Sequence, residues 1–222
     1  MTEVVLAFDC AVQGLGVAVV RDGVILAARR EEGREQAARL VPAIAEAMQE
    51  AGVDKRALSL IAVTTGPGSF TGVRVGLATA RGLAVALGIP LAGIATTACL
   101  LAQAETGDRI AVAAIDSHLG DWFCALRAGD AVPFVTSTEG LAARLAGRPC
   151  LVVGLEADRL APLLPDARAQ VGLPDPVVLA RLALEAGVEE WRVRNRTEGL
   201  PRPLYLRGVN ITTPDGVRRT VD

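Results

Sequence analysis

The sequence predicts an α/β protein of two lobes, each a mixed sheet with flanking helices. The chain has 222 residues and 51% of them are hydrophobic, which is enough to bury one good core or two small ones. Short apolar segments of strand length alternate with longer segments of helical periodicity. A weak internal repeat divides the chain into a first lobe at 1–106 and a second at 107–222, with the last residues returning to the first lobe or disordered.

The repeat is a pair of strands joined by a short polar turn. Apolar segments at 5–9 and 112–116 are both predicted to be strands, and they end in Asp9 and Asp116. Each is followed by a turn and by a second apolar strand. Two halves built in this way agree with a fold of two related lobes.

The first lobe begins with a hairpin and then alternates helices and strands. Continuously apolar residues predict strands that are buried on both faces, and the Asp-Gly dipeptide at 22–23 predicts a tight turn. Pro42 lies inside the first helix and predicts a kink. A connecting helix at 96–106 starts at Thr96 or Thr97. The predicted strands are 4–8, 15–20, 24–28, 58–65 and 89–95, and the predicted helices are 35–51 and 70–87.

The second lobe is less regular because four prolines between 162 and 176 interrupt it. The polar segment from Thr212 onward is predicted to fray. Besides the two strands of the repeat, the predicted elements are a helix at 139–146, a strand at 150–153, a short helix near Leu155 and a helix at 175–187.

Residues 64–88 are the most informative segment, TTGPGSFTGVRVGLATARGLAVALG. Small residues recur at every fourth position of the predicted helix and therefore form one stripe. An interior glycine costs a helix about 1 kcal/mol relative to alanine, so the stripe indicates close packing. The packing element is either the sheet of the same lobe or a partner helix, and steric grounds favour neither. The stripe consists of Gly72, Gly76, Ala80 and Ala84.

The turn before this helix lacks the familiar nucleotide-binding and nucleophile motifs. No lysine follows Gly68 where a P-loop requires it, and Thr71 stands where the dinucleotide fingerprint has its third glycine. Ser69 is not in a Gly-x-Ser-x-Gly context. Ser69 or Thr71 is therefore predicted to cap the helix.

Composition limits the classes of protein that fit. The net charge is −2, so no global basic field attracts nucleic acid. The seven arginines of 188–222 are interpreted first as a solvated surface and second as a minor contact to a polyanion or an acidic partner. A tRNA partner is therefore expected at most indirectly, with any binding weak and sensitive to salt. No apolar run reaches the roughly 18 residues that cross a bilayer, and the N-terminus enters a strand directly. These features predict a cytoplasmic protein. Its cysteines, far apart in the sequence, are predicted to be buried free thiols: Cys10, Cys99, Cys124 and Cys150.

The segment from Gly66 to Thr96 resembles the signature of the TsaB family of bacterial tRNA threonylcarbamoyladenosine biosynthesis proteins. Weaker similarities follow in the expected order along nearly the whole chain, in VLAFDCA, RREEGREQAARLVPAI, AAIDSHLGDWFCAL and PLYLR. One departure is Gln36, which stands where family members usually carry a histidine. Two lobes with paired strand-aspartates also resemble the actin, sugar kinase and Hsp70 superfamily, which shares the RNase H-like fold.

Asp9 and Asp116 match the positions at which kinases of that superfamily hold ATP phosphates. Here the first hairpin is filled by the side chains of residues 10–13, and the second contains an extra acid, Asp121. We therefore interpret both aspartates as remnants of phosphate hairpins that now form Asx turns, a role we favour about two to one over catalysis. His118, the only histidine, is predicted to be an exposed hairpin residue, which leaves no two-histidine metal site.

The resemblance implies a non-catalytic partner subunit without cofactor or metal. Similar proteins pair with the catalytic subunit TsaD and with the small ATPase TsaE, and they self-associate as homodimers when TsaD is absent. Together these proteins attach a threonylcarbamoyl group to the adenosine beside the anticodon. The alternative is an enzyme of the same superfamily that binds ATP or acts as a metallopeptidase.

The partner interface is predicted on the two helices of the first lobe, at 35–51 and 70–87. Small residues of the second helix permit close approach, and apolar residues of both supply contact area. The predicted interface residues are Val41, Ile44, Gly72, Val73, Gly76, Leu77 and Ala80.

Overall fold

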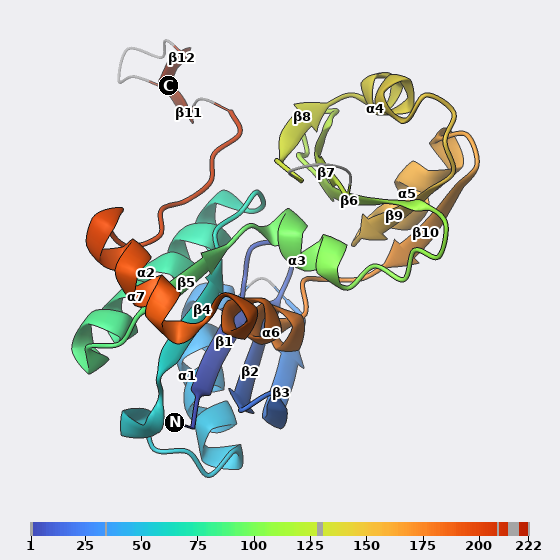
Figure 1. Ribbon diagram of the computed structural model, residues 1–222. Coiled ribbons are helices and arrows are strands. Elements are labelled where there is room, and N and C mark those ends of the chain that lie inside the picture. The colour runs from blue at the N-terminus through green and yellow to red at the C-terminus, as the bar shows by residue number, and fades with distance from the viewer. Residues whose placement is uncertain (1, 34, 128–130, 208, 213–217, 222) are drawn as a thin grey trace.

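The strands of each half of the chain form one five-stranded sheet in the computed structural model (Figure 1). The structure describes residues 2–33, 35–127, 131–207, 209–212 and 218–221, the last two ranges as backbone only. In the first sheet the order is β3-β2-β1-β4-β5, in which β2 is antiparallel to its neighbours β1 and β3, and β4 and β5 are parallel to β1. Its strands are β1 (Val4–Asp9), β2 (Leu15–Arg21), β3 (Val24–Glu31), β4 (Leu60–Thr64) and β5 (Leu91–Ile94).

The second sheet repeats this plan with the order β10-β9-β6-β7-β8. A central strand that ends in aspartate has an antiparallel hairpin partner on one side and a parallel strand on the other. The predicted internal repeat and the two-lobed, actin-like α/β fold are thereby confirmed. The strands are β6 (Ile110–Asp116), β7 (Trp122–Leu126), β8 (Phe134–Thr136), β9 (Cys150–Gly154) and β10 (Ala167–Val171).

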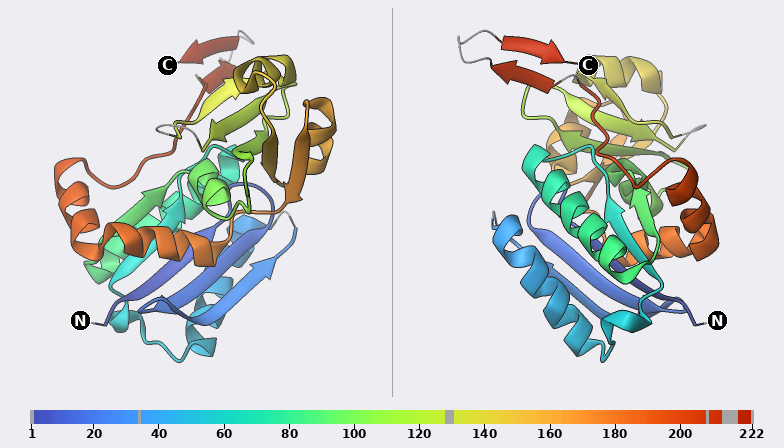
Figure 2. Two further views of the ribbon diagram at one scale, coloured as in Figure 1. Left: turned by 45° about the vertical axis from the view of Figure 1, so that its right-hand side comes forward. Right: turned by 90° about the vertical axis from the view of Figure 1, so that its left-hand side faces the viewer.

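The central strand β1 is buried on both faces, and a different set of helices covers each face. Leu6 and Phe8 point to one side, where they pack with α1 (Gln36–Glu50) and α2 (Phe70–Leu87). Val5 and Ala7 point to the other side because side chains alternate along a strand. Figure 2 shows α1 and α2 on one side of this sheet and α6 on the other.

The second face of the first sheet is covered by residues 176–197, so the return to the first lobe that was expected only of the last residues begins earlier, at α6. Helices α6 (Pro176–Ala186) and α7 (Val188–Thr197) pack on the first lobe, where Leu179 and Ala183 join the cluster of Val5 and Ala7. A sheet that is apolar on both faces needs this cover, and the helix at 175–187 is the apolar element that supplies it.

The remaining helices are short and complete the second lobe and the connections. Cys99 of α3 packs in the first lobe, whereas Leu100 and Leu101 pack against the second sheet, so α3 lies between the two. The elements are α3 (Thr96–Ala102), α4 (Thr138–Leu145), α5 (Ala157–Leu160) and the 3-10 turns Lys55–Ala57 and Ala161–Leu163.

Most predicted elements of the first lobe are present with boundaries shifted by a few residues. The connecting helix ends at Ala102 instead of 106, and α1 continues through Pro42 as one helix. The segment predicted to fray includes 213–217 and 222, which lie outside the described residues. Around it the backbone pairs β11 (Val209–Thr212) with β12 (Arg218–Val221), an antiparallel hairpin that the sequence did not predict.

Two predictions from composition have different outcomes. All four cysteines are free and buried, as expected. Contrary to the prediction, α2 is long and apolar enough to cross a membrane by length and composition alone, with a mean hydropathy of 1.2. It packs on the sheet of its own lobe, but only 33% of its residues are buried there. A helix of that composition with so much exposed surface has an apolar face left open.

Candidate functional site

A cleft of about 990 Å³ lies between the two lobes. The turn after β1, the start of α2, the turn after β6, the residues before α5 and the segment after α7 all contribute to its walls. Both predicted phosphate hairpins are therefore at the cleft. Representative lining residues are Val12, Gln13, Ser69, Ser117, Glu156 and Tyr205.

Asp9 ends β1 beneath the cleft and is only 1% exposed. Its Oδ1 accepts hydrogen bonds from the backbone N–H of Ala11 at 3.1 Å and from the Thr64 hydroxyl at 2.5 Å. Burial raises the pKa of this carboxyl above its ordinary value, although the two hydrogen bonds and the charge of Arg30 act against the shift. The bond to Ala11 is an Asx turn, as predicted.

Asp116 makes the corresponding turn in the second lobe but lies in the wall of the cleft. Its Oδ1 accepts from the backbone N–H of His118 at 2.7 Å, and its Oδ2 pairs with Arg159 at 3.2 Å. The His118 side chain is 81% exposed, as expected of a hairpin residue. Asp116 is thus occupied by its own turn and by an arginine.

Glu156 is a cleft residue that the sequence did not single out. It follows β9, and its Oε2 is buried without a hydrogen-bond partner among the described residues. Burial raises the pKa of Glu156, and the nearby charge of Asp116 raises it further. Sequence alone gave no signal for it, because an isolated glutamate before a short helix is ordinary. No group of three potential metal ligands occurs among the residues that the structure describes.

The first hairpin is closed by the start of α2. The backbone N–H of Ser69 donates to the Ala11 carbonyl at 2.6 Å, and the Ser69 hydroxyl caps the helix by accepting from Gly72 N–H at 3.2 Å. Ser69 is therefore the N-cap, as predicted. A Cβ at Gly68 would collide with the Ala11 carbonyl, so only glycine permits this approach. The amides of Ser69 and Gly72, which a phosphate loop could offer to an anion, are used within the chain.

The small-residue stripe of α2 faces the sheet of its own lobe. A Cβ at Gly72 would overlap the Cys10 carbonyl, and one at Gly76 would lie 3.3 Å from Cys10 Sγ and 3.4 Å from Val63. Ala80 is fully buried in the same cluster. Of the two explanations that the sequence left open, internal packing accounts for the stripe.

This placement corrects the predicted interface residues. Ile44 of α1 and the five predicted residues of α2 are buried within the first lobe, so they cannot supply contact area to a partner of the folded chain. Val41 is the exception among the seven, with 60% of its surface exposed. The error has a physical cause: glycine permits close approach of any backbone, and here the backbone is that of Cys10.

Two further faces of α2 follow from the helical spacing. Residues 70, 74 and 81 face the segment after α7, which we call the strap (residues 200–207). The third face, which we call the open face, is only partly buried or exposed and carries no charge. The open face consists of Thr71, Val75, Ala78, Gly82 and Val85.

The strap crosses α2 and the strand ends and then reaches the second lobe. Leu204 N–H donates to the Thr65 carbonyl at 2.8 Å, and Arg81 Nε donates to the Pro201 carbonyl at 3.0 Å. At its end Arg207 pairs with Asp121 of the β6–β7 turn. The strap therefore belongs to the cleft wall and joins both lobes.

The arginine-rich segment is less basic than its sequence indicates. Arg192 pairs with Glu189 at 3.1 Å, and Arg194 pairs with Glu190 at 2.8 Å, on the surface of α7. The side chains of Arg218 and Arg219 lie outside the described residues. Of the arginines of this segment that the structure describes, Arg207 lines the cleft, and it is paired with Asp121.

Comparisons with known proteins agree with this geometry. Residues 30–124 match the family model of TsaD, tRNA N6-adenosine threonylcarbamoyltransferase. The chain is 32% identical over 123 residues to the tRNA threonylcarbamoyladenosine biosynthesis protein TsaB of Escherichia coli (strain K12), a match that covers 54% of this chain and 53% of that protein. The chain thus spans about half the length of the curated relatives it matches.

Similarity to solved structures extends over nearly the whole chain. YeaZ from Pseudomonas aeruginosa is 30% identical with a TM-score of 0.74, and the match covers 92% of this chain and 100% of that one. A second structure, described as an uncharacterized protein with similarity to the peptidase YeaZ from the same organism, has a TM-score of 0.75 at the same identity and coverage. With a match of this identity over the full length of a relative, the chain belongs to the family of TsaB and YeaZ proteins.

Proposed function

We propose that this chain is the non-catalytic partner subunit of a TsaD-like transferase that attaches a threonylcarbamoyl group to adenosine in tRNA. The open face of α2 is the observation that carries the proposal. It belongs to an 18-residue helix with a mean hydropathy of 1.2, of which the chain itself buries only 33%. An uncharged face of small and apolar residues on a rigid helix suits a protein partner.

The partner interface in this proposal keeps the two predicted helices but uses their exposed faces. On α2 the contact area comes from the open face, where Ala78 and Gly82 allow a helix to approach closely. On α1 it comes from Val41 and its exposed neighbours Pro42 and Ala45. The same surface can bind a second copy of the chain, which accounts for a homodimer in the absence of TsaD.

The closed hairpins support a subunit that does not itself perform the chemistry. Asp9 is buried and bonded within its own turn, and Asp116 is bonded to its turn and to Arg159, so neither carboxylate is free to orient a metal ion or phosphates. In the proposed assembly the TsaD-like subunit performs the transfer in the cytoplasm, and a TsaE-like ATPase acts on the pair.

The partner surface is tested by co-purification with TsaD of the same organism. Val85, 71% exposed on the open face, is changed to aspartate, and Val171, 56% exposed on β10 of the second lobe, is changed to aspartate as the matched control. We expect Val85→Asp to weaken the complex at least tenfold, because a charge is left unpaired in a desolvated interface. Equal retention of TsaD by both variants would contradict the proposed surface.

The non-catalytic role is tested separately in a reconstituted reaction. TsaD and TsaE should modify tRNA only when this chain is added, and the chain alone should neither modify tRNA nor hydrolyse ATP. Turnover by the isolated chain that Asp9→Ala abolishes would instead identify it as an enzyme of the superfamily. Peptide cleavage by the isolated chain would lead to the same reassignment.

A further inference from the structure

The fold brings together an exposed aromatic pair that is distant in the sequence. Phe70 at the start of α2 and Tyr205 in the strap are 47% and 42% exposed, and their ring centroids are 5.9 Å apart at an angle of 31°. Arg74 lies 3.6 Å over the Phe70 ring, and its Nε donates to the Tyr205 hydroxyl at 2.8 Å. We call Phe70, Arg74 and Tyr205 the aromatic platform. Both rings line the mouth of the interlobe cleft.

The surroundings of the platform are positively charged. Residues 58–104, which include all of α2, contain Arg74 and Arg81 and no acid, and the strap contains Arg202 and Arg207 and no acid. Across the cleft, Asp116 and Asp121 are already paired with arginines. The first-lobe rim therefore presents Arg74 beside flat apolar rings, whereas Arg207 is already paired with Asp121. Glu156, whose Oε2 has no hydrogen-bond partner among the described residues, is a lining carboxylate that is not compensated in this way.

We propose that the aromatic platform binds an unpaired nucleotide of RNA, an inference that rests on the proposed function in tRNA modification. Unstacked bases bind proteins by stacking on aromatic rings and on guanidinium planes, and the phosphates of the strand pair with arginine. The platform has both kinds of group within one small surface. Rigid attachment supports this use, because Arg74 is held over the Phe70 ring and bonded to the Tyr205 hydroxyl, and the strap is bonded to Thr65 and Arg81.

The platform and the proposed protein interface use different faces of α2. Residues 70 and 74 are on the face toward the strap, and at 100° per residue the centre of the open face is about a quarter of the helix circumference away from it, with Ala78 and Val85 nearest to Arg74. A subunit centred on Thr71, Val75 and Gly82 therefore leaves the platform accessible to RNA.

Binding is measured with a short fluorescent RNA hairpin that has an unpaired loop, titrated with the full chain at low salt. Removal of a stacking ring by Phe70→Ala or Tyr205→Ala should weaken binding by about 5- to 150-fold. Tyr205→Phe keeps the ring and should bind within about threefold of the unchanged chain. Binding should weaken as salt rises, because arginine contacts to phosphates release counterions. Thermal unfolding of each variant establishes that it is folded.

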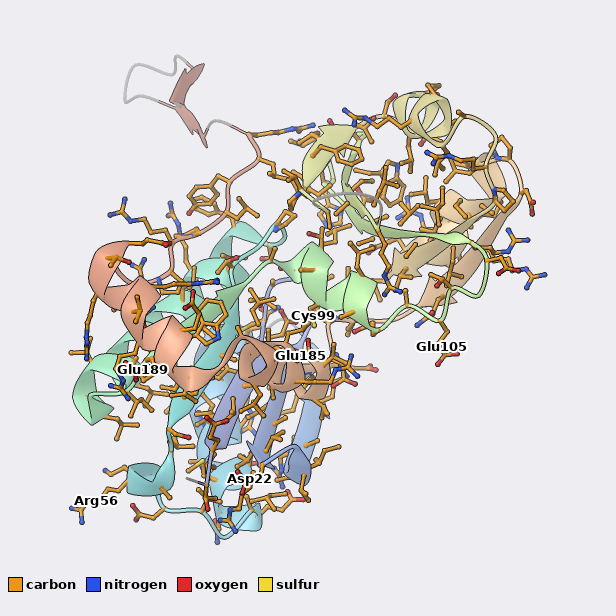
Figure 3. The ribbon with its side chains drawn as sticks, in the orientation of Figure 1. Asp22, Arg56, Cys99, Glu105, Glu185 and Glu189 are labelled. Carbon is orange, nitrogen blue, oxygen red and sulfur yellow. The ribbon has the colours of Figure 1, made fainter. Side chains whose placement is uncertain are left out.

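Matched controls come from other arginines. Arg144 lies 4.2 Å over the Phe134 ring in the second lobe, so Arg144→Ala removes a similar cation–π contact from a different place. Arg56 is exposed at the end of the first lobe remote from the second lobe (Figure 3), so Arg56→Ala removes an equal charge far from the cleft. Arg74→Ala should weaken RNA binding, whereas both controls should bind RNA like the unchanged chain.

Several outcomes would overturn the proposal. They are no RNA binding by the unchanged chain, unchanged binding by the two ring variants, or equal losses in Arg74→Ala and Arg144→Ala. If free adenosine monophosphate binds as tightly as the hairpin, the platform is a mononucleotide site. If the ring variants no longer bind TsaD but still bind RNA, the platform is a protein contact. TsaD co-purification is measured separately, so the two proposals can fail independently. A chain that does not bind RNA but retains TsaD contradicts only the platform, whereas a chain that does not retain TsaD contradicts the proposed function.

Discussion

At the scale of single residues, each of the two strand-aspartates forms a hydrogen-bonded turn at the end of its strand. Both Asp9 and Asp116 accept a hydrogen bond from the amide two residues ahead, the Asx geometry that the sequence predicted. Their difference in burial was not predictable, because it depends on what covers each hairpin. Asp9 lies under the start of α2, whereas Asp116 faces the cleft.

Because the pKa of Asp9 is raised in the folded chain, the free energy of unfolding should depend on pH. Between the ordinary pKa and the raised one, the folded chain retains a proton that the unfolded chain has lost, so stability falls as pH rises through that window. Asp9→Asn keeps the Oδ1 acceptor for Ala11 and Thr64 and cannot ionise. We expect it to be more stable than the unchanged chain at neutral pH and equal to it at acid pH, as measured by urea unfolding.

Asp9→Ala serves as the contrasting variant. It removes the acceptor of two buried donors and should cost about 1–3 kcal/mol at any pH. An Asp9→Asn variant that is less stable than the unchanged chain at neutral pH would show that the ionised carboxylate is favoured, with Arg30 as the cation that acts on it.

Glycines on two faces of α2 should respond oppositely to alanine. Gly72→Ala places a Cβ against the Cys10 carbonyl and should cost about 1–3 kcal/mol, because backbone cannot move aside easily. A Cβ at Gly82 would meet no heavy atom within 4 Å, so Gly82→Ala should stabilise the chain by about 0.5–1 kcal/mol through helix propensity. Denaturant unfolding of the isolated chain measures both, and the reverse order would mean that the faces are assigned wrongly.

At the scale of elements, the sequence predicted the turns and helix caps that depend only on neighbouring residues. The Asp-Gly turn joins β2 to β3 with positive φ at Asp22 and Gly23, and Ser69 caps α2, because both depend on neighbours in the chain. The edge strands β8 and β10 were missed. They have mixed polarity, with residues partly buried or exposed, so no alternation marks them in the sequence.

Helix α7 and the strap were missed for a different reason. Helix α7 is polar and held by Trp191, its one buried residue, whose indole N–H donates to the Ala183 carbonyl at 2.9 Å. The strap has no regular structure and gains its place from contacts to residues more than a hundred positions earlier. Neither kind of contact leaves a periodic pattern in the sequence. For the same reason the sequence did not predict the aromatic platform.

The anchoring of the strap can be tested at Arg81. Arg81→Met keeps an apolar stem but removes the donors to the Pro201 carbonyl, and a hydrogen bond from a charged donor contributes about 1.5–3 kcal/mol. We expect faster amide hydrogen exchange at Leu204, whose N–H bonds to Thr65, without a change in the core strands. Arg192→Met on α7 is the control, and exchange at Leu204 that is equally slow in both variants would argue against this anchor.

At the scale of the whole molecule, the chain leaves the first lobe, builds the second and returns. The two crossings are joined where the Gln103 side chain donates to the Leu173 carbonyl at 3.0 Å and accepts from Asp175 N–H at 3.1 Å. Sequence periodicity located both sheets but assigned the returning helices to the nearer lobe. The apolar strands of the first sheet, buried on both faces, were the signal that a further cover was required.

This return predicts how shortened chains behave. A chain that stops at residue 174 keeps every strand of both sheets but loses α6 and α7, which leaves Val5, Ala7 and Leu60 facing water. Burial of each larger side chain of this kind contributes about 1.5–3 kcal/mol. Exposing several of them therefore removes a large share of the free energy of unfolding of a domain, which is about 5–15 kcal/mol. We expect this chain to aggregate or to bind a hydrophobic dye, whereas a chain that stops at residue 207 should unfold cooperatively near the temperature of the full chain. If the chain ending at 174 folded as stably as the one ending at 207, α6 would be dispensable and the first sheet would not depend on the residues that return from the second lobe.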